Sequence, residues 1–346
     1  MSLWIRLKLA ESPAFARMKA EGKGSKTPLK DSFGKWPNLK LVLLALVGLT
    51  AGQAVVWYTG QFYSLFFLEK TLKVDGLTTN ALVATALLIG TPFFVVFGWL
   101  SDKIGRKPII LAGCLLAMLT YFPIFKALTT AANPALAAAS ASAPVTVIAD
   151  PADCAFQFDP VGKKAFASSC DIAKSALANA GVSYRNEAAP AGTLARVRIG
   201  QAEVAGIDGR ALSRKDLADA RAAWTKTLGG ALSQAGYPAK ADPARINKPL
   251  VVGLLTLLVL YVTMVYGPVA AALVEMFPAR IRYTSMSLPY HIGNGWFGGF
   301  LPATAFAMVA ASGDIYRGLW YPIVIAAVTL VAGGLFIREM RGAPID

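Results

Sequence analysis

Long apolar stretches separated by short polar segments make up most of the chain. Six of them lie at residues 39–68, 77–100, 109–128, 250–274, 285–310 and 319–337. A helix needs about 20 residues to cross a hydrocarbon core of about 30 Å, because each residue advances it by about 1.5 Å. Six such stretches in a chain of 346 residues predict six transmembrane helices, and they favour a multi-pass membrane protein over a large soluble core.

The composition supports this class. Hydrophobic residues make up 55% of the chain and charged residues 16%, a more apolar balance than soluble domains have. The formal net charge of +14 is by itself compatible with nucleic-acid binding. Much of the basic charge, however, borders the apolar stretches, where lysine and arginine meet lipid headgroups. We therefore expect membrane lipid as a partner and no nucleic acid.

Lysine and arginine in the short connections predict the orientation, since these residues are retained on the cytoplasmic side. They cluster in alternate connections and in both terminal segments, at Arg6, Lys8, Arg17, Lys19, Lys23, Lys26, Lys30, Lys35, Lys103, Arg106, Lys107, Arg280, Arg282, Arg338 and Arg341. The chain is therefore expected in the cell inner membrane, with both termini on the cytoplasmic side and residues 129–248 in the periplasm. The leading segment lacks the apolar region of a signal peptide.

A charged turn joins the second and third apolar stretches. Residues 98–108 read Gly-Trp-Leu-Ser-Asp-Lys-Ile-Gly-Arg-Lys-Pro. The glycines allow a tight hairpin, and the charges beside them can form and break ion pairs. A second charged turn, Glu-Met-Phe-Pro-Ala-Arg-Ile-Arg-Tyr at residues 275–283, follows the fourth stretch.

These two turns resemble the loop signatures of the major facilitator superfamily, and specifically the C-terminal half of its metabolite:proton symporters. The positions that match the first signature are Gly98, Leu100, Ser101, Asp102, Gly105, Arg106 and Lys107, and the similarity covers residues 1–128 and 249–346. The resemblance implies secondary active transport of a small organic acid or zwitterion with protons, by alternating access. It implies a transporter without a cofactor and not an enzyme.

Transporters of this superfamily have twelve helices in two halves, whereas this sequence predicts six. The expected fold is an all-α membrane protein, half of the twelve-helix fold, with a small α/β extracytoplasmic insertion between its third and fourth helices. We divide the chain into an inter-half cytoplasmic linker (1–38), helices one to three (39–128), the periplasmic insertion (129–248), helices four to six (249–337) and a cytoplasmic tail (338–346). The missing N-terminal half is an expected partner, because the chain resembles the product of a truncated or split gene.

The charged turns predict a cytoplasmic gate. Asp102 ends its helix, where the helix dipole disfavours an anion, and Glu275 has the same need for a cation. Pairs between the turns would hold the cytoplasmic side closed and would break as it opens. Alternatively, these charges only anchor the helices at the headgroups. The candidate residues are Asp102, Arg106, Lys107, Glu275, Arg280 and Arg282.

Polar and aromatic side chains within the spans predict a substrate path. Amides are costly in lipid, so they should face a solute-conducting cavity, or else form hydrogen bonds between helices. The only histidine of the chain could carry a proton or could be a satisfied structural residue. The candidates on the first, fourth and fifth spans are Gln53, Trp57, Gln61, Tyr266, Tyr290, His291 and Asn294.

Glycines and prolines punctuate the spans. The pairs Gly48/Gly52 and Gly295/Gly299 have the small-xxx-small spacing that permits close helix contact. Prolines inside helices remove a hydrogen bond and promote kinks; they stand at Pro92, Pro123, Pro268, Pro289 and Pro302.

The insertion predicts a small α/β unit, with strands at 145–148 and 194–199 and a helix at 171–180. Ser213 and Asp216 match a helix capping box, and an apolar helix face follows at Leu217, Ala220, Trp224, Leu228 and Leu232. In an oxidising periplasm, Cys154 and Cys170 are expected to form a disulfide that stabilises this small unit, although two free thiols are the alternative. Cys114, within a span, is expected to be an apolar filler.

The insertion shows no metal-ligand spacing and no catalytic constellation in its sequence. Two function classes therefore remain. The first is a secondary transporter half, and the second is a transport-incompetent fragment or accessory membrane protein that presents a periplasmic interaction domain.

Overall fold

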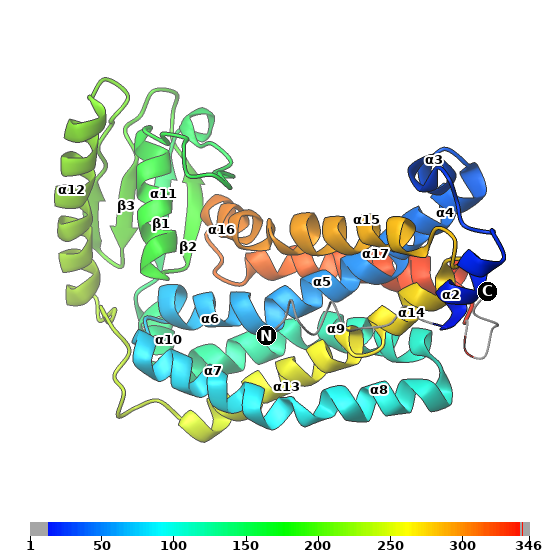
Figure 1. Cartoon of the computed structure of the whole chain (residues 1–346). Helices are drawn as coiled ribbons and strands as arrows, with labels where there is room; N and C mark the ends of the chain where they lie inside the picture. The colour runs from blue at the N-terminus through cyan, green and yellow to red at the C-terminus, as the bar shows by residue number, and fades with distance from the viewer. Residues whose placement is uncertain (1–12, 340, 342–346) are drawn as a thin grey trace.

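The computed structural model describes residues 13–339 and 341 and folds them into a helical bundle with an α/β unit at one end (Figure 1). Among the described residues, six helices are long and apolar enough to cross a membrane: Trp36–Thr71, Gly76–Ile104, Arg106–Ala132, Lys248–Met276, Arg282–Ser312 and Arg317–Phe336. The six predicted spans are therefore confirmed as helices. Each helix extends slightly beyond its apolar stretch, except that the sixth ends at Phe336. Residues 1–12 of the predicted linker, with Arg6 and Lys8, and residues 340 and 342–346 of the predicted tail lie outside the described residues.

Most of the spans consist of several helical segments. The first contains α4 (Trp36–Ala45), η1 (Leu46–Thr50), α5 (Ala51–Tyr58), η2 (Thr59–Tyr63), α6 (Ser64–Phe66) and η3 (Phe67–Thr71). The second contains α7 (Gly76–Gly90) and α8 (Pro92–Ile104), and the third is α9 (Arg106–Ala132). The fourth contains α13 (Lys248–Tyr266) and α14 (Val269–Met276), the fifth α15 (Arg282–Ile292), η5 (Gly293–Gly298) and α16 (Leu301–Ser312), and the sixth η6 (Arg317–Leu319) and α17 (Trp320–Phe336). The breaks at Pro92 and Pro268 fit the loss of a backbone donor at proline.

The remaining helices precede or follow the spans. The segments α2 (Pro13–Ala20) and α3 (Pro28–Phe33) lie before the first span, and α10 (Pro134–Ser142) leads from α9 into the insertion. In Figure 1 the α8–α9 turn, the start of α4 and the end of α17 lie at the end of the bundle opposite the insertion. We call these the turn end and the insertion end.

Small residues bring the first and sixth spans into close contact. A Cβ added at Gly48 would lie 3.2 Å from the backbone nitrogen of Gly333, and one added at Gly52 would lie 2.6 Å from Thr329 Cγ2. The Thr329 hydroxyl donates to the carbonyl of Val47 at 2.7 Å. The close contact predicted at Gly48 and Gly52 is therefore confirmed.

The close contact predicted at Gly295 and Gly299 is wrong. A Cβ at Gly295 would meet no atom of the described residues within 4 Å, and one at Gly299 would meet the backbone of Gly295 in its own span. Gly293 and Gly298 make the contacts instead, against Thr50 and Tyr58. The reason is that η5 is a π-helical turn, whose wider repeat brings residues five apart onto one face.

The insertion is a two-layer α/β unit. Its sheet has the order β2-β1-β3-β4 and comprises β1 (Val145–Ala149), β2 (Tyr184–Ala188), β3 (Arg196–Ile199) and β4 (Ala202–Ala205). The strands β1 and β2 are parallel and are joined through the short η4 (Pro151–Asp153) and the helix α11 (Ser169–Ala180). Strands β1 and β3, and β3 and β4, are antiparallel. The predicted strands at 145–148 and 194–199 and the predicted helix at 171–180 thus correspond to β1, β3 and α11.

The predicted cap of the last insertion helix is confirmed. Ser213 accepts the backbone N–H of Asp216 at 3.2 Å and precedes α12 (Arg214–Gln234). Of the predicted apolar face, Leu217, Trp224, Leu228 and Leu232 are buried, and the indole of Trp224 donates to the carbonyl of Ala205 in β4 at 2.6 Å. The helix therefore closes the core of the insertion.

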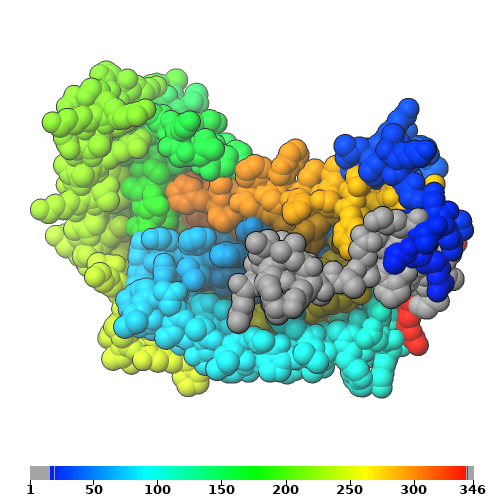
Figure 2. Space-filling view, viewed as in Figure 1, coloured from blue at the N-terminus to red at the C-terminus, as the bar shows by residue number. Residues whose placement is uncertain are grey.

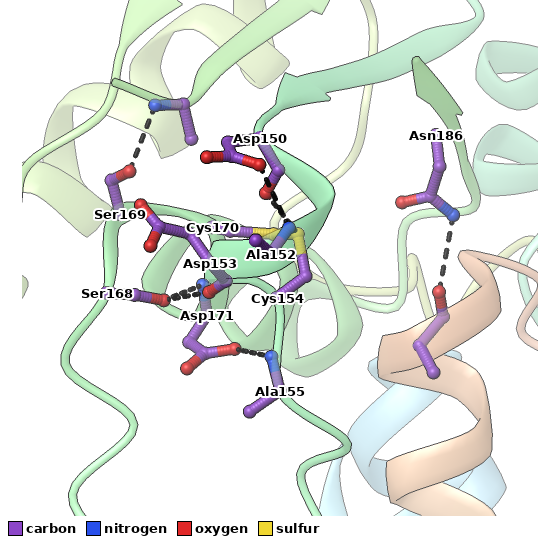
Figure 3. Close-up of a disulfide and its surroundings, with 12 residues drawn as sticks. Asp150, Ala152, Asp153, Cys154, Ala155, Ser168, Ser169, Cys170, Asp171 and Asn186 are labelled. Carbon is purple, nitrogen blue, oxygen red and sulfur yellow. Dashed lines mark hydrogen bonds between the residues drawn. A yellow bond between two sulfur atoms is a disulfide. The ribbon is translucent and has the colours of Figure 1, made fainter. Parts of the chain in front are cut away.

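Hydrogen bonds hold the insertion against the first and fifth spans at the insertion end of the bundle. Tyr184 of β2 donates its backbone N–H to the carbonyl of Gly313 at 2.8 Å and its hydroxyl to the carbonyl of Ala310. Figure 3 shows Asn186 reaching from β2 to the end of α16. Its amide donates to the backbone carbonyl of Ser312 at 3.0 Å. Asn133 donates to the carbonyl of Leu72 at 2.9 Å, after the first span. In the space-filling view the insertion stands beyond the bundle in contact with α16 (Figure 2).

Candidate functional site

Arg106 joins the two charged turns. It is the first residue of α9 and follows Gly105, whose φ is +106°. One guanidinium nitrogen, Nη2, lies 2.8 Å from Asp102 Oδ1 and 3.1 Å from Glu275 Oε1. The other, Nη1, donates to the carbonyl of Ser101 at 2.6 Å. A single arginine therefore links the end of α8 to the end of α14.

The two ion pairs of Arg106 differ in burial. The side chains of Arg106 and Glu275 are 13% and 12% exposed, whereas that of Asp102 is 68% exposed. Arg106 Nε and Glu275 Oε2 are buried without a hydrogen-bond partner in the described part of the chain. Because desolvation of a buried ion pair costs about as much as the attraction returns, the Arg106–Glu275 pair can separate at a small net cost.

The other predicted members of the charged set have different contacts. Arg280 is exposed, and Arg282 donates through Nε to the carbonyl of Phe277 at 3.0 Å. Lys107 donates to the carbonyls of Gly334 at 2.8 Å and Ile337 at 2.7 Å. Of the three arginines among the gate candidates, the structure thus pairs Arg106 with Asp102.

Glu339 is a functional candidate that the sequence analysis missed. Its carboxylate accepts the backbone N–H of Arg106 at 3.2 Å and that of Lys107 at 2.9 Å. The first N–H groups of a helix need acceptors, and a glycine at the N-cap position cannot supply a side chain. The Gly105-Arg106 sequence was the available signal that an acceptor must come from elsewhere in the chain.

Five of the predicted substrate-path residues meet inside the bundle. The Gln53 amide donates to Asn294 Oδ1 at 3.3 Å, and Asn294 donates to the carbonyl of Tyr290 at 2.9 Å. The hydroxyls of Tyr290 and Tyr266 lie 3.1 Å apart. The rings of Tyr266 and Trp57 are stacked with centroids 6.1 Å apart. The first, fourth and fifth spans are therefore connected by one polar and aromatic network.

One buried polar atom of this network has no hydrogen-bond partner among the described residues. Gln53 is fully buried, and its Oε1 accepts no hydrogen bond from the described residues. The other two substrate-path candidates lie at the margin of this network. The half-buried Gln61 side chain makes no hydrogen bond to the described part of the chain. His291 is exposed, and its ring centroid lies 5.8 Å from that of Tyr290.

The two cysteines of the insertion form a disulfide. Cys154 and Cys170 are bonded, with their Cα atoms 5.2 Å apart, and Figure 3 shows the bridge between the end of η4 and the start of α11. Ser168 and Asp171 hold the same junction, because the Ser168 hydroxyl caps Asp171 and Asp171 accepts the N–H of Ala155 at 2.8 Å. Cys114 is a free thiol buried in α9.

Six apolar helices in the described part of the chain, with a charged turn at one end and a polar network inside, indicate a multi-pass membrane protein. The sequence model described as "Major Facilitator Superfamily" matches residues 1–153. Over these residues the chain is similar to this superfamily of transporters.

Several curated proteins are similar to part of the chain. A protein of Staphylococcus haemolyticus named as a proline/betaine transporter is 30% identical over 115 residues, which are 32% of this chain and 23% of that protein. The alpha-ketoglutarate permease of Escherichia coli is 29% identical over 134 residues, 39% of this chain and 29% of the permease. The citrate-proton symporter of Salmonella typhi is 35% identical over 77 residues, 22% of this chain and 18% of the symporter.

These matches cover about a quarter of the length of the relatives. No solved structure matches the chain.

Proposed function

We propose that the chain forms one six-helix half of a secondary transporter, which carries a small organic acid or zwitterion together with protons across the cell inner membrane. The similarity to this superfamily supports transport. The observation that carries the proposal for this half is the position of Arg106 between Asp102 and Glu275. A missing N-terminal six-helix half completes the carrier, since transport paths of this kind lie between two repeats.

The group of Arg106, Asp102 and Glu275 is proposed as the cytoplasmic gate. The basic residues of the turn end support a cytoplasmic location by the positive-inside rule, with both termini on that side and the insertion in the periplasm. In the closed inner face, Arg106 holds the ends of α8 and α14 together. Opening separates Glu275 from Arg106, while the exposed Asp102 keeps the arginine charge compensated.

The network of Gln53, Trp57, Tyr266, Tyr290 and Asn294 is proposed as this half's part of the substrate path. The unpartnered Gln53 Oε1 can accept an N–H or O–H from a solute. The stacked rings of Trp57 and Tyr266 present aromatic faces, which attract cationic groups. These features, with relatives named for proline/betaine, alpha-ketoglutarate and citrate, support a zwitterion or an organic acid as substrate.

Proton coupling is supported by the name of one relative, the citrate-proton symporter. In this chain His291 is the candidate proton carrier, because its ring lies beside that of Tyr290 in the network and an imidazole can take up and release a proton. Proton-driven uptake that persists unchanged in His291→Gln would remove His291 from this role.

The experiment is co-expression of the chain with the N-terminal six-helix half of the same transporter, followed by uptake of radiolabelled proline, glycine betaine, α-ketoglutarate and citrate. Uptake that needs both pieces supports the proposal. If the pair takes up none of these solutes, the alternative of a transport-incompetent fragment or accessory membrane protein with a periplasmic interaction domain replaces it.

The gate is tested within the same assay. Glu275→Gln keeps the shape of the side chain but removes its charge, so uptake should fall roughly tenfold if the pair contributes about 1.4 kcal/mol to the inward-closed state. Lys126→Met, at an exposed position of α9, is the matched control and should leave uptake unchanged. Wild-type uptake by Glu275→Gln would refute the gate while leaving the similarity to the superfamily intact.

A further inference from the structure

The insertion contains a pocket that the proposed transport path does not use. It lies where the parallel strands β1 and β2 end, at Ala149 and Ala188. Ligands of open α/β sheets commonly bind at the carboxyl edge of parallel strands, where the connections to the helices diverge. The pocket has a volume of about 270 Å³, and its walls include Val147, Ala149, Cys154, Asn186 and Ala188.

Lys174 of α11 also lines this pocket. The residue is only 8% exposed, and its ammonium makes no hydrogen bond or ion pair with the described residues. Burial lowers the pKa of Lys174, and the nearby Asp171 opposes this shift. The ammonium thus borders the pocket without a hydrogen-bond or ion-pair partner among the described residues, and a cation held in this position favours an anionic ligand.

The acidic groups around Lys174 are engaged elsewhere. Asp171 Oδ1 accepts the N–H of Ala155 at 2.8 Å. Glu187, which also borders the pocket, pairs with Arg198 at 3.3 Å on the opposite, charged face of the sheet. Asp150 accepts the N–H groups of Ala152 and Gly192. None of these carboxylates forms a hydrogen bond or a close ion pair with the Lys174 ammonium in the described part of the chain.

We infer that this pocket binds a small organic carboxylate, with its anionic group on the Lys174 ammonium and its short carbon chain against Val147, Ala149 and Ala188. A single lysine suits a monoanion, because phosphate is better matched by an arginine fork or a nest of N–H groups. The Asp171 carboxylate near Lys174 would repel a second negative charge on the ligand. The volume lies below that of pockets for drug-sized ligands, which favours a solute of a few carbon atoms.

The site is independent of the transport proposal, because it lies outside the membrane-spanning helices. The test therefore uses the purified full chain in detergent and does not require uptake. Lysines are acetylated with a limiting amount of an N-hydroxysuccinimide ester, and the modified positions are quantified by mass spectrometry. Propionate is the probe, sodium chloride at equal ionic strength is the reference, and inorganic phosphate is the competing anion.

Propionate should slow acetylation of Lys174 by roughly tenfold at a concentration about ten times its Kd, since about one-tenth of the sites are then free. Exposed Lys163, in the loop before α11, should react at an unchanged rate. No selective protection of Lys174 by propionate would overturn the inference. Equal protection by phosphate would also overturn it, because the site would then select charge and not carboxylate.

Calorimetry provides a second measurement. Lys174→Met should lose propionate binding, whereas the matched control Lys163→Met should keep it. If Lys174→Met binds propionate as the wild type does, the assignment of Lys174 is refuted. If Lys174→Met fails to fold, the acetylation rates of Lys174 in the wild-type chain, with and without propionate, decide whether the pocket binds the carboxylate.

Discussion

Lys107 and Glu339 hold the start of α9 against the end of the sixth span in both directions. Glu339 accepts the backbone N–H of Lys107 at 2.9 Å, and the Lys107 ammonium donates to the carbonyls of Gly334 and Ile337 at the end of α17. An anion thus lies at a helix N-terminus and a cation at a helix C-terminus, which are the favourable positions in the helix dipoles. The two residues complement both helix ends at once.

Glu339→Gln should therefore lower the stability of the bundle. Hydrogen bonds to charged groups contribute about 1.5–3 kcal/mol, and partial exposure reduces this to about 1 kcal/mol here. The measurement is the thermal unfolding midpoint of the purified chain in detergent. Lys107→Met should lower the midpoint to a similar degree, and Lys126→Met on the same helix should not. Equal midpoints for Glu339→Gln and wild type would contradict the contact.

Gly105 should not tolerate a side chain. Its φ of +106° and ψ of 157° lie in a region that is essentially restricted to glycine, and a Cβ at this position would clash with the Glu339 carboxylate. Gly105→Ala should destabilise the chain by about 1–3 kcal/mol. The control is Gly98→Ala in the same turn, where a Cβ meets no atom of the described residues within 4 Å. If both variants unfold at the same temperature, the constraint at Gly105 is absent.

Removal of the disulfide should destabilise the insertion. Cys154 and Cys170 are separated by 16 positions, and closing a loop of this length stabilises a fold by about 3 kcal/mol in the chain-entropy description. The double variant Cys154→Ser/Cys170→Ser should therefore lose protection against proteolysis between residues 155 and 168. Reductant should produce the same loss in the wild type and no further loss in the double variant. Cys114→Ala, at the buried free thiol, should not change the response.

Acid should weaken the insertion through Asp150. The N–H groups of Gly192 and Ala152 donate to its carboxylate at 2.8 and 2.9 Å and lower its pKa. Because the folded pKa lies below the unfolded value of about 3.9, the stabilisation is present above about pH 4 and is lost as pH falls through the folded pKa. The thermal unfolding midpoints of the wild type and of Asp150→Asn should approach each other as pH falls from about 6 to about 3. The exposed Asp219→Asn is the control, and a stability difference that stays constant over this range would argue against the assignment.

The parts of the fold that depend on local sequence were predictable. The lengths of the apolar stretches predicted the six spans, and the capping residues Ser213 and Asp216 predicted the start of α12. The strands β2 and β4 were missed because their residues are largely exposed and lack the alternation of a half-buried strand. Glu339 was missed for another reason: it binds backbone groups of Arg106 and Lys107, more than 230 positions away, and a backbone acceptor leaves no side-chain pattern. The π-helical turn η5 likewise changed which glycines face Thr50 and Tyr58.

The hydrogen bonds from Tyr184 and Asn186 to the last turn of α16 couple the insertion to the fifth span, and the hydrogen bond from Asn133 to the carbonyl of Leu72 couples it to the first. A tilt of the fifth span against the first should therefore displace the insertion, and α12, which packs on β4 at the opposite edge of the sheet from β2, should move farther than α16 itself. A fluorescent probe attached to α12 would then report helix motion from outside the lipid, without any label inside the bilayer.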